Sequence, residues 1–160
     1  MKSLAAGVIG LLITTGVAAA QTPAERDAIL RDFQRRVAEY STQHQCLDMF
    51  PEALSASAPA PQLFTPPVAL VFRQLIANAL AAVDTATAWR GSGVPDHRAR
   101  VLAPLPGDAT EMPPPLAKAL PALPADLEYR FVDNDLVLRD RTAGVIVAVL
   151  RNAVGVAALK

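Results

Sequence analysis

The sequence contains two histidines and one cysteine, the residue types most often used for metal binding and nucleophilic catalysis. His44 and Cys46 form a His-x-Cys pair, and both side chains can bind soft metal ions. A zinc-type site needs three or four ligands, however, and the other histidine, His97, falls in a predicted loop. We therefore expect a partly buried helix end at this pair, and we assign no metal or cofactor site.

A second set of reactive residue types lies near the middle of the chain. Ser92, Asp96 and His97 are the residue types of a hydrolase triad. Triads are assembled from distant segments, whereas these three lie within six positions, and the sequence lacks a G-x-S-x-G elbow. We predict no catalytic residue, and the sequence favours a protein that is not an enzyme.

Two charged clusters have structural explanations. The Asp-Asn-Asp run at 133–135 resembles the start of a calcium loop, but the glycine and closing glutamate of an EF-hand are absent, so we predict a hairpin turn. Arg31, Arg35 and Arg36 suggest an anion-binding patch. The nearby acidic residues Asp27, Asp32 and Glu39 neutralise this patch. We therefore expect a solvated helix face.

The first 20 residues predict a cleavable signal peptide. Lys2 precedes an apolar run over 4–17, and three alanines at 18–20 give the small-x-small pattern of a cleavage site before Gln21. An uncleaved anchor is the alternative, but this run is shorter than the roughly 20 residues that span a bilayer core. We expect a periplasmic or secreted protein.

The remaining chain, 21–160, is expected to form a single domain with no membrane span after cleavage. The most apolar later stretch, 68–83, contains Arg73, whose charge is costly to bury in lipid. Basic and acidic residues balance at 15 each, so there is no electrostatic reason to expect binding to nucleic acid. The single Cys46 cannot form an internal disulfide; it is either buried, which we favour, or bridges to another chain.

A first amphipathic helix is predicted from Thr22 to about His44 or Leu47. Thr22 and Glu25 have the spacing of a capping box, with Pro23 at the first helical position. Apolar and aromatic residues then recur every three or four positions on one face: Ile29, Phe33, Val37 and Tyr40.

Proline-rich connections flank a second predicted amphipathic helix. The first, at about 51–67, contains Leu63 and Phe64, which we expect to pack back on the core. The helix begins near Thr65 and extends to Trp89, before glycines that suit a C-terminal stop. The second connection spans about 94–124, where the prolines at 113–115 start either a short helix or a polyproline II segment.

The C-terminal region predicts a three-stranded antiparallel β-meander. Short runs rich in β-branched and aromatic residues occur at 127–132, 136–139 and 145–150, separated by residues typical of turns. One face of such a sheet must be covered, and the two helices are the obvious cover, which gives an α+β fold. The last strand can lie at a sheet edge, so we expect an unknown protein partner or second copy to pair there.

This meander also resembles a known family. Residues 123–124, 129–132, 135–138 and 144–147 are similar to the C-terminal segment of small periplasmic RcnB-type proteins linked to nickel and cobalt homeostasis. They also look like exported bacterial proteins of unassigned function. The resemblance covers about 28 residues. This sequence has no histidine-rich segment, so no metal ligands are carried over to it. The resemblance implies an exported protein with a non-enzymatic accessory role.

We therefore expect a periplasmic accessory or interaction protein without catalysis. The alternative is a small-molecule or metal-binding module between the helices and the sheet, with Tyr40, His44 and Cys46 as its first candidates. A hydrolase is the least favoured class, because it needs a pocket that holds a histidine beside a buried carboxylate.

Overall fold

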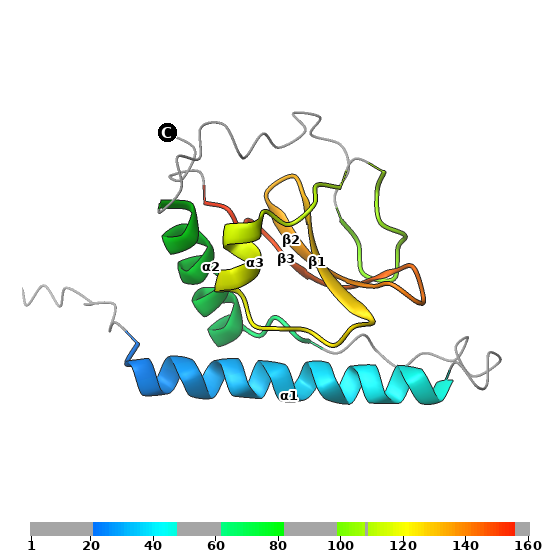
Figure 1. The fold of residues 1–160 in the computed structure, drawn as a ribbon, viewed down its shortest axis with the longest axis horizontal. Coiled ribbons are helices and arrows are strands. Elements are labelled where there is room, and N and C mark those ends of the chain that lie inside the picture. Colours follow the sequence, from blue (N-terminus) through cyan, green and yellow to red (C-terminus); the bar gives the residue numbers. More distant parts are fainter. Residues whose placement is uncertain (1–20, 48–61, 82–98, 108, 156–160) are drawn as a thin grey trace, which may run out of the picture.

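The computed structural model describes residues 21–47, 62–81, 99–107 and 109–155, and for 44–47 only the backbone. Helices and a sheet make up an α+β fold, as predicted (Figure 1). The elements are α1 (Pro23–Leu47), α2 (Pro66–Ala81), α3 (Pro114–Ala119), β1 (Leu127–Val132), β2 (Asp135–Asp140) and β3 (Ile146–Leu150). Several predicted features lie outside the described residues or, for Cys46, outside the described side chains. They are the signal peptide, Cys46, the end of the second helix at Trp89 and the residues at 92–97 compared with a hydrolase triad.

Helix α1 begins at the predicted capping box. The backbone N–H of Thr22 donates to Glu25 Oε2 at 2.8 Å, and the Glu25 N–H donates to Thr22 Oγ1 at 3.3 Å. The backbone hydrogen bond from Thr22 lowers the pKa of the Glu25 carboxyl. These two bonds satisfy N–H groups that no helical carbonyl can reach, which is why the helix begins here.

Replacing this cap gives a local test. We expect Thr22→Ala to destabilise the first turn of α1 by about 1 kcal/mol, because a helix N–H loses its acceptor. Faster amide exchange at Glu25 and Arg26 measures the effect. Thr42→Ala is the control: its hydroxyl donates to the Ala38 carbonyl on the exposed surface of the same helix, and its removal leaves the first turn unchanged. Equal exchange changes in both variants would contradict this role of Thr22.

Two of the three arginines of the suggested patch on α1 are neutralised, as the sequence predicted, whereas Arg31 has no ion pair with any described residue. Arg35 pairs with Asp32 and Glu39 at 2.6 Å each, and Arg36 pairs with Asp32 at 2.8 Å. The hydrogen bond between Arg35 and Asp32 lowers the pKa of the Asp32 carboxyl and raises the pKa of the Arg35 guanidinium. Arg35 and Glu39 are exposed, and Asp32 and Arg36 are only partly buried, so the pairs add little to stability and form a solvated face.

The residues before α2 pack into the core, as predicted. Leu63 is fully buried, and the Phe64 ring lies 5.9 Å from Phe33 and 5.3 Å from Phe72, measured between ring centroids. Phe72, on α2, also contacts Tyr129 on β1. These rings join α1, α2 and the sheet in one apolar cluster, where aromatic edge contacts add to burial.

The prolines at 113–115 start a helix. Pro114 occupies the first position of α3, where its missing N–H removes no hydrogen bond, and Leu116 turns into the core. This resolves the alternative of polyproline II. Helix α3 is a third helix, and it lies inside the stretch 94–124 that we predict from the sequence as a proline-rich loop.

The sheet is an antiparallel meander of order β1-β2-β3, as predicted. The β1–β2 pairing runs from Leu127 opposite Asp140 to Val132 opposite Asp135. Asp133 takes the positive φ of the first turn, at 52°, and Gly144 takes that of the second, at 71°. Positive φ suits the two-residue turn at 133–134, whose twist matches the strands, whereas the second turn is longer, at 141–145, and glycine adopts the left-handed region there without strain.

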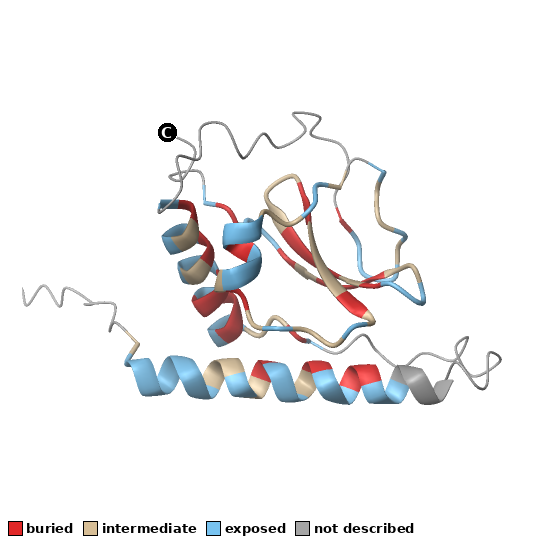
Figure 2. Ribbon diagram, in the orientation of Figure 1, coloured by how far each residue is buried: buried red, intermediate tan, exposed pale blue. Residues whose placement is uncertain are grey.

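Both faces of the sheet carry apolar residues. The main cluster lies under the helices and includes Phe131, Leu136 and Leu138, whereas a smaller one joins Val137 and Ile146 to the segment near Ala99. Figure 2 shows the buried positions along the strands, on α2 and in the second half of α1. No helix in the described ranges is long and apolar enough to span a bilayer.

Candidate functional site

A groove of about 540 Å³ lies beside strand β1. Its apolar wall comes from α3 and the residues around it, and includes Met112, Ala117 and Leu123. Three consecutive residues of β1 complete the lining: Glu128, Tyr129 and Arg130. Alternate side chains of a strand point to opposite faces, so a groove lined by three in a row follows the edge of the strand.

The backbone N–H and carbonyl of Tyr129 point away from β2, towards this groove. Phe131, two residues on, exchanges hydrogen bonds with Thr110 on the side of β1 that is remote from β2. Because backbone groups of alternate strand residues point the same way, the Tyr129 N–H and carbonyl also point to that side. Within the described ranges, neither group has a backbone partner.

The open part of the edge is short and has defined ends. Thr110 closes one end through N···O distances of 2.9 and 3.2 Å to Phe131. At the other end, Leu127 donates its N–H to the Pro124 carbonyl at 3.1 Å. After Thr110 the chain continues through Glu111 and Met112 to the prolines that start α3, and in the described ranges it forms no further bridge with β1.

The Tyr129 side chain anchors the groove's inner wall. Its hydroxyl donates to the Pro121 carbonyl at 3.2 Å, which ties the chain after α3 to the strand. Burial raises the pKa of the Tyr129 phenol, so the hydroxyl stays protonated and able to donate. The inner wall is therefore apolar and fixed.

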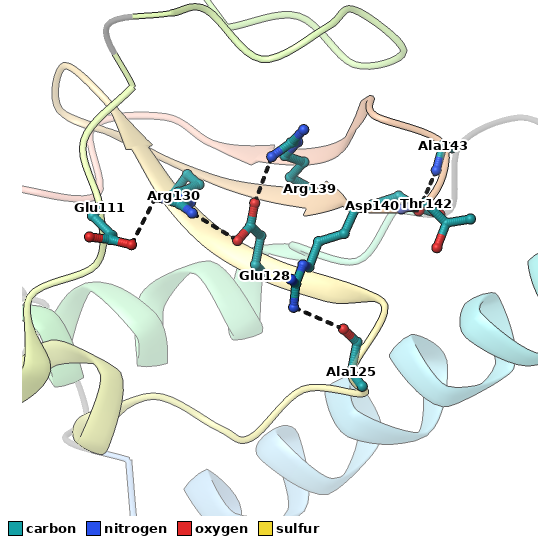
Figure 3. Close-up of polar contacts among 9 residues, drawn as sticks. Glu111, Ala125, Glu128, Arg130, Arg139, Asp140, Thr142 and Ala143 are labelled. Atoms are coloured by element: carbon teal, nitrogen blue, oxygen red, sulfur yellow. Dashed lines mark hydrogen bonds and ion pairs between the residues drawn. The ribbon is translucent and has the colours of Figure 1, made fainter.

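The outer rim of the groove is a row of alternating charges (Figure 3). Glu128 accepts from Arg130 at 3.0 Å and from Arg139, its cross-strand neighbour, at 2.9 Å. Glu111 lies 3.6 Å from Arg130, and its side chain is 86% exposed. Glu111 is therefore the rim charge most available to a ligand.

The protonation of Glu128 gives a pH test. Burial alone would raise the pKa of its carboxyl, but hydrogen bonds from Arg130 and Arg139 outweigh this and lower it below the ordinary 4.5. A lowered folded-state pKa adds stability above the unfolded value, and this is lost as pH falls through the folded value. We expect Glu128→Gln to be less stable by up to about 1 kcal/mol at pH 7, and the difference to shrink by pH 3.

Urea unfolding of both proteins at the two pH values measures this. Glu111→Gln is the control, because that carboxylate is exposed and more distant from its arginine, and we expect it to have little effect at either pH. A difference between wild type and Glu128→Gln that is the same at pH 7 and pH 3 would show that the arginine contacts do not stabilise the charged form.

Of the ligand residues suggested by the sequence, Tyr40 has a structural partner. Its hydroxyl donates to Asp140 Oδ2 at 3.2 Å, and Asp140 Oδ1 accepts the N–H groups of Thr142 and Ala143 at 2.8 Å each. Burial, together with the Asp140 charge, raises the pKa of Tyr40. The next residue, Ser41, contacts both carboxylate oxygens of Asp126. These bonds attach α1 to the sheet.

The side chains of His44 and Cys46 lie outside the described part, so their predicted roles stay predictions. In the described ranges no three His, Cys, Asp or Glu side chains lie close enough to hold a metal ion. Asp135, in the run compared with a calcium loop, contacts Arg151 and accepts the Asn152 N–H at 2.9 Å. The predicted hairpin turn accounts for this run.

The predicted interaction edge on β3 is partly occupied. Ile146 accepts from Leu102 at 2.7 Å and donates to the Ala103 carbonyl at 2.9 Å. A partner strand therefore cannot pair at Ile146 without displacing this segment. The sequence pointed to the last strand and missed the edge of β1, whose only local signal is the proline run that diverts the chain at 113–115.

Comparison with known proteins identifies no relative: no family model matches the sequence, and no curated protein or solved structure matches it either.

Proposed function

We propose that the protein is exported and that its mature chain is a periplasmic or secreted accessory protein, without catalysis, that binds another protein. The groove beside β1 carries the proposal. It combines an apolar wall, a charged rim and strand backbone groups that no described residue satisfies. Exposed apolar surface beside open backbone donors and acceptors is typical of sites that receive a polypeptide.

The leader supports the proposed compartment. Its basic start, apolar run and alanine triplet have the order that a signal peptidase needs. Amino-terminal sequencing of natively produced protein tests this. We expect the chain to begin at Gln21 and to fractionate with the periplasm or the medium. A chain that begins at Met1 in the cytosolic fraction would contradict the proposal.

Site-specific photocrosslinking in the native cells tests the binding role. Ala117 is exposed on α3 and lines the groove, so a photoreactive residue there is expected to give a discrete protein adduct. Ala38, an exposed alanine of α1 outside the groove, is the matched control and is expected to give none. No adduct at 117, or the same adducts at both positions, would contradict a role for the groove.

A small molecule is the second candidate ligand, because the groove volume of about 540 Å³ falls in the range of small-molecule sites. Native mass spectrometry of protein purified from the periplasm separates the two candidates. A bound mass that Ala117→Trp removes and Ala38→Trp retains would favour the small molecule. Metal analysis of the same material tests the metal-binding form of this alternative.

A further inference from the structure

We infer that the occupant of the groove is a short extended peptide segment of another protein, which pairs antiparallel with β1 at Tyr129. This inference rests on the proposed function, because it names the chemistry of the partner at the same groove. The Tyr129 N–H and carbonyl lie on the side of β1 remote from β2, where Phe131 pairs with Thr110 and no described residue pairs with Tyr129. A peptide residue opposite Tyr129 would donate to its carbonyl and accept from its N–H.

The two closures of the edge set the length of the paired segment. Thr110 occupies the position opposite Phe131, and Pro124 accepts from Leu127. Only 128–130 lie between these closures, so the peptide pairs over about three residues and leaves the strand at both ends. A terminus or an exposed loop of a partner fits this space, whereas a long strand does not.

The lining sets the side chains that the segment needs. Residues directly opposite each other on neighbouring strands point to the same face, so the peptide residue opposite Tyr129 lies beside Met112 and Leu123, which pack against the main core. An apolar residue fits there. The residues on either side of it point to the outer rim, where the exposed Glu111 carboxylate favours a basic residue.

A set of capped peptides tests this mode of binding. The probes are acetyl-Gly-Ser-Lys-X-Lys-Ser-Gly-amide, with X as Ala, Val, Leu, Met or Phe, added to the mature chain, 21–160. We expect saturable shifts of the Tyr129 amide resonance, with larger apolar X binding more tightly. Ala117→Trp is expected to abolish the shifts by filling the groove, and Ala38→Trp to leave them unchanged.

N-methylation of the peptide separates strand pairing from other contacts. The amide of X points at the Tyr129 carbonyl, so methylating it is expected to weaken binding about tenfold or more. The amide of the following Lys points away from β1, and its methylation is expected to change binding less than about threefold. In Glu111→Gln, the lysine peptides are expected to bind severalfold more weakly.

The outcomes distinguish the inference from the function on which it rests. Saturable binding that does not respond to methylation at X overturns strand pairing, and so does the absence of binding by every probe at millimolar concentration. In either case a discrete adduct at position 117 would still support a protein-binding groove. Loss of both the adduct and the peptide binding overturns the function as well.

Discussion

Phe72→Ala is expected to lower the free energy of unfolding by about 3–5 kcal/mol, a large part of the stability of a domain this size. Phe72 is fully buried, and its ring lies 4.8 Å from Phe33 and 6.1 Å from Tyr129 between centroids. Its removal leaves a cavity where α1, α2 and β1 meet. Urea unfolding followed by circular dichroism measures the loss.

Leu70→Ala is the matched control for this substitution. Leu70 lies on the same helix, but its side chain is 46% exposed. We expect it to reduce stability by less than about 1 kcal/mol, because little apolar surface returns to water. If the two variants lost equal stability, the aromatic cluster would not be what joins the helices to the sheet.

Asp140→Ala is expected to lower the free energy of unfolding by about 2–3 kcal/mol. Asp140 is 2% exposed and accepts three hydrogen bonds, from the Tyr40 hydroxyl and from the turn N–H groups of Thr142 and Ala143. Water can reach the exposed turn, but the Tyr40 hydroxyl is left buried without this acceptor. The loss of an acceptor for a buried donor is the costly part.

A double-mutant cycle with Tyr40→Phe isolates the contact between α1 and the sheet. The two single substitutions break the same hydrogen bond, so their effects should not add. We expect the double variant to lose about 1 kcal/mol less unfolding free energy than the two single losses added together. Unfolding free energies of the four proteins give this coupling. Strict additivity would show that the Tyr40–Asp140 bond adds nothing to the attachment of α1.

Features decided by neighbouring residues could be predicted from the sequence. The capping box of Thr22 and Glu25 spans three positions, and the strand β1 is found at its predicted bounds, Leu127–Val132. Apolar spacing also placed Phe33 and Val37 in the core. In each case the chemistry that decides the structure lies within one turn or one strand.

Features decided by distant pairs could not be predicted. Tyr40 and Asp140 are 100 positions apart, and their hydrogen bond depends on where α1 lies relative to the end of β2. The candidate groove depends on Thr110 pairing with Phe131 and then leaving the strand. Local patterns show which residues form a strand, but the occupancy of each edge depends on chain segments remote in sequence. For this reason the sequence alone favours the edge of β3 and gives no sign of the edge of β1.

Amide hydrogen exchange of Tyr129 in the ligand-free chain 21–160 asks whether this edge of β1 is open to a partner strand. Arg130 is the internal reference, since its position in the strand directs its N–H towards β2. We expect the Tyr129 amide to exchange much faster than the Arg130 amide, and to become protected when the groove is filled. Equal protection of both amides in the free protein would mean that another part of the chain already pairs there, and would contradict the account.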